Sequence, residues 1–329
     1  MTELDYTFHA MGSDIRLLIG PRLVPTAPEP LVAADRERAF VLGFGQRLSR
    51  FRPDSELTAL NNDPRREVPA SPLLRTAVRA GVWAAECSNG LLDPTLVRAL
   101  ERSGYATSLD GAEPAPLSEA LASAPRRRPA RPDPSSRWRE IEIDDDAGVI
   151  IRPPGVMLDT GGTGKGLCAD AVAHRLGGYT RFVVDCGGDI AVGGVGARLE
   201  PYEIEIEHPL TLRPIGKVSL QAGGIATSGL NVRIWRDGDG NYAHHLLDPS
   251  TGVPAWTGLI GATALGATAL EAETCSKMAL LGGPVNARDV LAEHGGIIVH
   301  DHGEVEAIGP IEAVLYETSA PGPEPCEAV

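Results

Sequence analysis

From residue 140 onward, short apolar stretches follow one another across tight turns, and this pattern constrains the fold most strongly. REIEID and VIIR flank the turn sequence DDAG, and GIIVH and VEAIG form a similar pair near the end. Such pairs predict β-hairpins and therefore antiparallel strands. Helical patterns stand in blocks at 31–50, 73–88, 166–176 and 268–281 rather than alternating with strands. The sequence therefore predicts an α+β fold, with antiparallel or mixed sheets and flanking helices.

Two segments lie outside this regular pattern. The stretch 105–139 is rich in Pro, Ser and Arg, with one short helical pattern near 117–123, and it predicts a surface loop region. Its arginine run is either an anion-binding patch or an ordinary solvated loop. The tail 318–329 is predicted to be disordered. A chain of 329 residues indicates one large domain or two lobes.

Charge and cysteine usage exclude several classes of protein. The formal net charge of -14 argues against a duplex nucleic-acid partner, which needs a basic face. No apolar run is long enough to predict a membrane span. The first twenty residues lack the pattern of a signal peptide, and the five cysteines are scattered without a Cys-x-x-Cys pair. We therefore expect a cytoplasmic protein with reduced cysteines.

The stretch LDTGGTGKGLCAD, residues 158–170, joins a glycine-rich turn to a helical pattern. It is not a Walker loop, because Gly166 follows Lys165 where Ser or Thr is required, and Asp159 replaces the first glycine. It also lacks the G-x-G-x-x-G spacing of a dinucleotide fold. Backbone amides, a helix start and Lys165 together predict an anion site. The alternative is a simple strand-to-helix turn with a surface lysine.

Other stretches along the chain have the composition of site loops. In order, the chain contains AMGS, LSRFRPDSELTALN, GLLDPT, LDTGGTGKGLCAD, DCGGDI, TSG, HLLDPSTGVP and AETCSK. Taken together, these motifs resemble those of the FAD:protein FMN transferases, the ApbE family, from residue 10 to about 283. The resemblance implies a single domain over residues 1–317, in two lobes, with FAD extended in a cleft between them. It also implies a reaction in which a Thr or Ser hydroxyl of an acceptor protein takes FMN from FAD and AMP leaves.

The resemblance also implies roles for individual residues. Met11 would lie in the strand that meets the flavin nucleotide, and Asp159 would read the adenine edge. His245 would be the catalytic base, a usual role for histidine, and His244 a spare strand residue. Gly162 would offer its carbonyl to Mg²⁺. The positions assigned to FAD are Met11, Phe51, Leu91, Leu92, Asp93, Asp159, Lys165, Ser228 and Leu246.

The sequence departs from the family at the late helix, where the family has Asp and, four residues later, Thr as metal ligands. Here those positions hold Glu273 and Lys277. Glutamate can still ligate Mg²⁺, whereas a charged lysine has no lone pair. Three hypotheses follow: the Lys277 ammonium replaces the metal, the site has lost both metal and catalysis, or Lys277 turns out to solvent and fewer ligands hold the metal.

Three functions follow from these features. The first is FMN transfer from FAD to a protein, and the second is FAD hydrolysis by a pyrophosphatase with the same site. The third is non-catalytic FAD binding by a protein whose metal site is lost. A flavin-labelled acceptor protein would distinguish the first from the second, and intact bound FAD would indicate the third.

Overall fold

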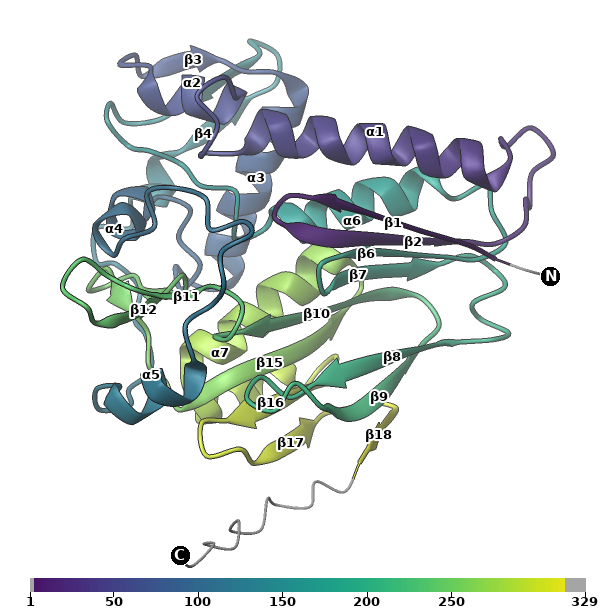
Figure 1. Cartoon of the computed structure of the whole chain (residues 1–329). Helices are drawn as coiled ribbons and strands as arrows, with labels where there is room; N and C mark the ends of the chain where they lie inside the picture. Colours follow the sequence, from purple (N-terminus) through teal and green to yellow (C-terminus); the bar gives the residue numbers. More distant parts are fainter. Residues whose placement is uncertain (1–2, 317–329) are drawn as a thin grey trace, which may run out of the picture.

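An eight-stranded antiparallel sheet forms the centre of the molecule (Figure 1). The computed structural model describes residues 3–316. Neighbouring strands pair antiparallel throughout this sheet, in the order β1-β2-β6-β7-β10-β15-β16-β17. Its strands are β1 (Leu4–Ala10), β2 (Ser13–Ile19), β6 (Phe182–Cys186), β7 (Asp189–Gly193), β10 (Gly223–Gly229), β15 (Leu259–Gly266), β16 (Gly296–His300) and β17 (Val305–Ile308). The predicted α+β fold with antiparallel hairpins is confirmed.

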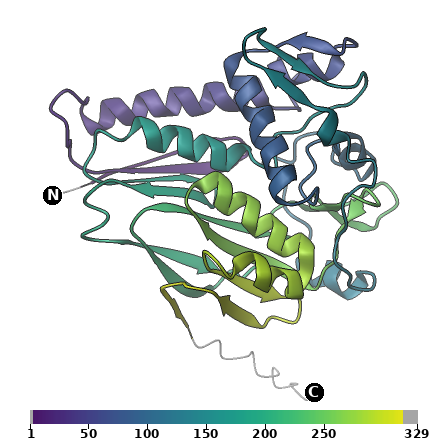
Figure 2. The ribbon, with the colours of Figure 1, turned by 180° about the vertical axis from the view of Figure 1, so that it is seen from behind.

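Three long helices cover one face of this sheet, as the view from behind shows (Figure 2). They are α1 (Pro30–Leu48), α6 (Gly164–Arg175) and α7 (Ala269–Leu291). α7 begins at an N-cap, Thr268, whose side chain accepts the amide of Glu271. At Gly283 the φ angle is 74°, and Pro284 follows, so α7 is kinked there. The kink lies just after the helical pattern predicted over 268–281, and α7 continues beyond it to Leu291.

Smaller elements surround the central sheet (Figure 1). A three-stranded sheet shares a hydrophobic core with β7, β10 and β15; it contains β8 (Tyr202–Glu207), β9 (Pro214–Leu220) and β18 (Ala313–Leu315). At one end lie α2 (Glu56–Asn62), α3 (Pro72–Cys87), β3 (Glu67–Pro69), β4 (Glu142–Asp144) and β5 (Val149–Ile151). The remaining elements are α4 (Val97–Arg102), α5 (Leu117–Ser123), a 3₁₀ turn (Arg137–Glu140), β11 (Ile234–Arg236), β12 (Tyr242–His244), β13 (Leu247–Asp248) and β14 (Val253–Pro254).

The N-terminal strand is the clearest correction to the sequence-based prediction. Met11 is expected within a strand, but β1 and β2 are separate strands joined by a two-residue turn at Met11 and Gly12. Both turn residues have positive φ angles, 54° and 67°, as the mirror-image hairpin turns require. Met11 therefore lies in a turn and not in a strand, which contradicts the predicted location.

The loop region 105–139 contains α5 at the predicted place but is anchored along its length. The amide of Arg128 donates to Trp256 O, and that of Ala130 donates to Leu281 O, both at 2.9 Å. The guanidinium of Arg127 pairs with Asp301 at 2.6 Å. Trp138 is 4% exposed. Arg127 and Arg128 of the arginine run therefore anchor this region to the rest of the fold, which composition alone did not indicate.

Three further expectations from the sequence concern the C-terminal tail, the division into lobes and membrane spans. The predicted disorder of 318–329 lies outside the described residues. The division of 1–317 into two lobes stays a prediction. Within residues 3–316, none of the helices combines the length and apolar character needed to cross a membrane.

Gly166 lies at a close contact between α6 and α7. A Cβ atom there would stand 2.7 Å from Ala269 O and 2.8 Å from Leu270 Cα, both backbone atoms. We expect Gly166→Ala to lower the free energy of unfolding by about 1–3 kcal/mol, because overpacking against backbone forces the helices apart. Gly43→Ala in α1 is the control, since nothing lies within 4 Å of its added methyl group. Urea unfolding should show no loss in that variant, and equal losses in both would contradict the prediction.

Candidate active site

Four charged side chains meet where α6, β7 and α7 come together, and we call them the charged network: Lys165, Asp189, Glu273 and Lys277. Lys165 Nζ lies 2.5 Å from Asp189 Oδ2, and Lys277 Nζ donates to Glu273 Oε1 at 2.7 Å. Asp189 is 1% exposed and Glu273 is 0% exposed. Each buried carboxylate is thus matched by one ammonium, as buried charges require. The network unites three predicted site residues from distant parts of the sequence.

The local sequence explains how Asp189 and Lys165 meet. Asp189 begins β7 directly after Gly187 and Gly188, whose φ angles of 71° and 90° are left-handed. Lys165 is the second residue of α6, and its Nζ also donates to Gly187 O at 3.2 Å. Asp189 is a site residue that the sequence analysis did not single out, although the motif DCGGDI contains it.

Helices α6 and α7 are joined by two carboxylates, each of which accepts backbone amides from the other helix. Glu273 Oε2 accepts the amide of Gly166, in the first turn of α6, at 2.9 Å. In return, the carboxylate of Asp170 accepts the amides of Ala269 and Leu270 at 2.8 and 3.0 Å. Negative charge at a helix N-terminus satisfies free amides and complements the helix dipole. These contacts fix the relative position of the two helices and hence of the charged network.

Burial dominates the electrostatics of the network. It raises the pKa of Glu273 to about 7; the charge of Asp189 adds to this shift, while Lys277 and Lys165 oppose it. Burial also disfavours the charge of Lys165. The carboxylates of Asp189 and Glu273 outweigh that effect and hold the pKa of Lys165 above its usual value. Lys165 therefore carries its positive charge at neutral pH.

The residues at the family's metal position do not fit Mg²⁺. Mg²⁺ requires oxygen ligands in near-octahedral geometry. One oxygen of Glu273 is bonded to Lys277 and the other to the Gly166 amide. Lys277 has only 10% of its side chain exposed, which contradicts the third of the three hypotheses, that Lys277 turns out to solvent. Gly162 lies exposed in the turn before α6, and within residues 3–316 no cluster of three or more His, Cys, Asp or Glu side chains could hold a metal.

His245, the predicted base, lies just after β12 and next to this network. Its Nδ1 stands 3.3 Å from Arg233 O, and the ring is partly buried. Burial lowers the pKa of His245 to about 3, and the positive charges of Lys277, Lys165 and Arg233 contribute to this shift. The Arg233 carbonyl acts in the opposite direction. The imidazole is therefore neutral at physiological pH and can accept a proton.

The neighbouring His244 belongs to the core, as predicted for a spare strand residue. It is 0% exposed and packs edge-on against Trp256, with ring centroids 4.8 Å apart. Its Nδ1 accepts the amide of Leu246 at 3.3 Å, and its Nε2 has no partner within the described chain. Burial and the neighbouring His245 lower the pKa of His244 to about 3.

This burial of His244 predicts a pH-dependent stability. Its native pKa is depressed, so the contribution is complete above the unfolded value of about 6.5 and is lost as pH falls toward 3. We expect His244→Phe to flatten the dependence of unfolding free energy on pH between 6 and 4 by up to about 1.4 kcal/mol per pH unit. Urea titrations at several pH values measure this slope. His174→Gln, at an exposed position, should keep the wild-type slope, and an unchanged slope in His244→Phe would refute the prediction.

A cluster of three aromatic side chains lies near Asp159, and Arg50 contacts both the cluster and Asp159. The ring of Phe51 is 5.2 Å from Tyr105, which is 5.1 Å from Trp235. The Arg50 guanidinium lies 4.1 Å from the Phe51 ring centroid and pairs with Asp159 at 3.2 Å. Only 5% of the Arg50 side chain is exposed. The sequence analysis missed Arg50 and Tyr105, because only the fold places them beside Phe51 and Asp159.

Met11 is connected to the His245 region through one arginine. Arg233 Nη2 donates to Gly12 O at 2.6 Å, while the Arg233 carbonyl faces the His245 ring. The β1–β2 turn therefore lies at the edge of the same site, although Met11 is not in a strand.

The remaining predicted FAD-binding residues have clear structural contacts of their own. Asp93 Oδ1 accepts the amide and hydroxyl of Thr95 at 2.8 and 2.6 Å, which closes the Asp-Pro-Thr turn, while its buried Oδ2 has no partner in the described chain. The hydroxyl of Ser228 lies 2.8 Å from that of Ser276 on α7. Leu92 and Leu246 are buried, and Leu91 packs against the same core. Contact of these residues with FAD stays a prediction.

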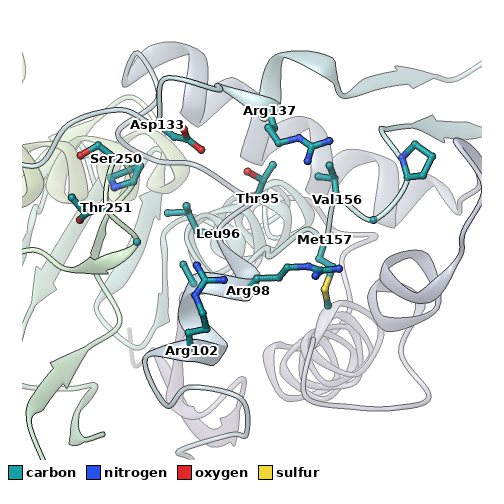
Figure 3. A pocket seen from close by; sticks show the side chains of 15 residues that line it. Thr95, Leu96, Arg98, Arg102, Asp133, Arg137, Val156, Met157, Ser250 and Thr251 are labelled. Atoms are coloured by element: carbon teal, nitrogen blue, oxygen red, sulfur yellow. The ribbon is translucent and has the colours of Figure 1, made fainter. Parts of the chain in front are cut away.

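A separate cavity of about 590 Å³ lies beside the Asp-Pro-Thr turn (Figure 3). Arg98, Arg102 and Arg137 contribute guanidinium groups to its lining, together with Thr95 and Thr251. Among the described residues, neither His245 nor the charged network lines it. Its basic lining is suited to an anion, but it was not part of the predicted site.

Comparison with known proteins agrees with the motifs. The ApbE family model matches residues 11–299. An FAD:protein FMN transferase of Klebsiella pneumoniae is 30% identical over 146 residues, which cover 43% of this chain and 41% of that protein. The FAD:protein FMN transferase of Treponema pallidum is 27% identical over 302 residues, covering 84% of this chain and 79% of that protein. The chain therefore matches about two fifths of the Klebsiella relative's length and most of the Treponema relative's length.

Solved structures share the fold. A crystal structure of the ApbE protein from Thermotoga maritima has a TM-score of 0.74 and 23% identity, and covers 93% of this chain and 97% of that chain. The flavinyl transferase ApbE of Pseudomonas stutzeri gives 0.72 and 23%, covering 93% and 95%. Because the family model spans most of the sequence and the folds agree, this chain belongs to the ApbE family.

Proposed function

We propose that this chain is an FAD:protein FMN transferase, which moves FMN from FAD to a Thr or Ser hydroxyl of an acceptor protein and releases AMP. One observation carries the proposal: residues from four family motifs converge on one buried site. Lys165, Asp189, Glu273 and Lys277 form the charged network, and His245 lies within electrostatic reach of it. The relatives named above carry the same activity in their names.

The chemistry follows from these side chains. The acceptor hydroxyl oxygen attacks the FMN phosphorus of FAD, and a new P–O bond forms. The bond from that phosphorus to the bridging oxygen breaks, and AMP leaves with the electron pair. His245 accepts the hydroxyl proton, since its imidazole is neutral. The ammonium groups at the site stabilise the negative charge that grows on the phosphates.

We place FAD extended between two lobes of residues 1–317. Phe51 and Tyr105, with the Arg50 guanidinium over both rings, would contact one end of the dinucleotide, where aromatic side chains suit a flat heterocycle. Asp159 keeps the role of reading the adenine edge, now held in place by its ion pair with Arg50. Lys165 lies at the start of α6, where a phosphate would meet both its ammonium and the helix dipole.

A single assay separates this function from its alternatives. The purified chain is incubated with FAD and with candidate acceptor proteins that carry accessible Thr or Ser residues. AMP release together with flavin fluorescence on the acceptor in a denaturing gel is the expected result. AMP and free FMN without a labelled protein would identify a pyrophosphatase instead. FAD that stays bound and intact with every acceptor would identify a flavin-binding protein.

A further inference from the structure

Lysine is rare in this chain, and its placement is informative. Only three of the 30 Lys and Arg residues are lysines: Lys165, Lys217 and Lys277. Two of these three belong to the charged network. An ammonium is a compact point charge, whereas the guanidinium of arginine is broad, planar and less strongly hydrated. A chain that uses arginine almost everywhere thus places its compact cations at one site.

The two lysines lie nearer the surface than their carboxylates. The side chains of Lys165 and Lys277 are 29% and 10% exposed, against 1% for Asp189 and 0% for Glu273. A ligand that approaches from solvent therefore meets the lysine side chains before the carboxylates. Lys277 Nζ donates one hydrogen bond within residues 3–316, to Glu273 Oε1, although an ammonium has three donors. Two donors of Lys277 are available for phosphate oxygens.

Stability alone gives no reason for this pair. An i, i+4 ion pair on a helix stabilises by only about 0.2–0.5 kcal/mol when exposed. Buried pairs can often be replaced by apolar side chains without loss. In a site of low dielectric constant, however, a fixed ammonium attracts a phosphate much more strongly than it would in water. The Lys277–Glu273 pair is therefore expected to contribute more to phosphate binding than to the stability of the fold.

We propose that Lys277 supplies the positive charge that binds the FAD pyrophosphate, so that this protein binds and cleaves FAD without a divalent metal. The cleavage part of this inference rests on the proposed function, and the binding part does not. Glu273 acts as a positioning residue, because it orients Lys277 through one oxygen and holds the start of α6 through the other. These residues do not fit Mg²⁺ because Lys277 itself supplies the positive charge at this position.

The decisive experiment measures FAD binding by titration calorimetry, first with a chelator and then with Mg²⁺. The wild-type protein should bind FAD with the same Kd, within about twofold, in both buffers. Lys277→Met should weaken FAD binding at least about tenfold, the loss expected when one charged contact is removed. Riboflavin lacks the phosphates, so its affinity should not change in this variant. Lys217→Met, which removes the third lysine from β9, is the matched control and should bind FAD like the wild type.

Several outcomes would overturn the inference. Loss of wild-type FAD binding in chelator, restored by Mg²⁺, would show that a metal supplies the charge. Unchanged FAD binding by Lys277→Met would show that Lys277 does not. Equal weakening toward riboflavin would indicate a damaged fold rather than a lost cation. If binding behaves as expected but no AMP forms with any acceptor, the proposed function fails and the cation role of Lys277 in binding stands.

Discussion

Replacing His245 by Asn is expected to reduce flavin transfer about 10²–10⁴-fold while leaving FAD binding nearly unchanged. A positioned general base contributes a rate factor of this size, and Asn cannot accept the proton at neutral pH. His245 is a neutral imidazole within electrostatic reach of Lys165 and Lys277, and among residues 3–316 the hydrogen-bond partner of its Nδ1 is the Arg233 carbonyl. Single-turnover AMP release, with saturating FAD and acceptor, measures the chemical step directly.

The low pKa of His245 bears on this result. Burial and three nearby cations depress it to about 3, below the range in which a general base works best. We expect bound pyrophosphate to add negative charge beside the same cations and so to raise the pKa of His245. We therefore expect His245 to be a stronger base in the FAD complex than in the empty site.

Exposed His174→Asn is the control for the His245 variant and should transfer flavin at the wild-type rate. Calorimetric FAD affinity within about threefold of the wild type would show that the His245→Asn site is intact. Transfer by His245→Asn at more than a tenth of the wild-type rate would mean that another group accepts the proton.

Much of the fold and part of the site could be predicted because they depend on local sequence. The α-helices α1, α3 and α6 follow apolar periodicity, and the hairpin of β16 and β17 follows its turn. The motifs identified Lys165, Glu273, Lys277 and His245, and the fold brings these four into one neighbourhood.

What the sequence did not reveal depends on tertiary contacts. The strand β10, GGIATSG, consists of small residues with weak strand propensity, yet it packs closely under α7. A Cβ at Gly224 would collide with the backbone of Thr268, so the composition that hides the strand is what permits the close packing. The turn at Met11 and Gly12 lacks the usual Asn-Gly signal. Arg50 and Asp189 gain meaning only through partners far away in the chain.

Replacing Lys165 by Met is expected to lower the free energy of unfolding by about 3–5 kcal/mol. The substitution leaves the carboxylate of Asp189, 1% exposed, without its ammonium partner, and an unpaired buried charge destabilises by about this amount. Adding Asp189→Asn removes the charge as well, and we expect the double variant to recover at least half of the loss. Lys217→Met is the control and should unfold like the wild type in urea at pH 7.

The comparison between the single and double variants decides what Lys165 does for the fold. Equal destabilisation of both would mean that the methylenes and the Gly187 contact of Lys165 matter, rather than the charge of Asp189. Recovery in the double variant would instead show that the charge of Lys165 stabilises the fold by neutralising Asp189. Lys165 would then be required to keep the charged carboxylate of Asp189 buried.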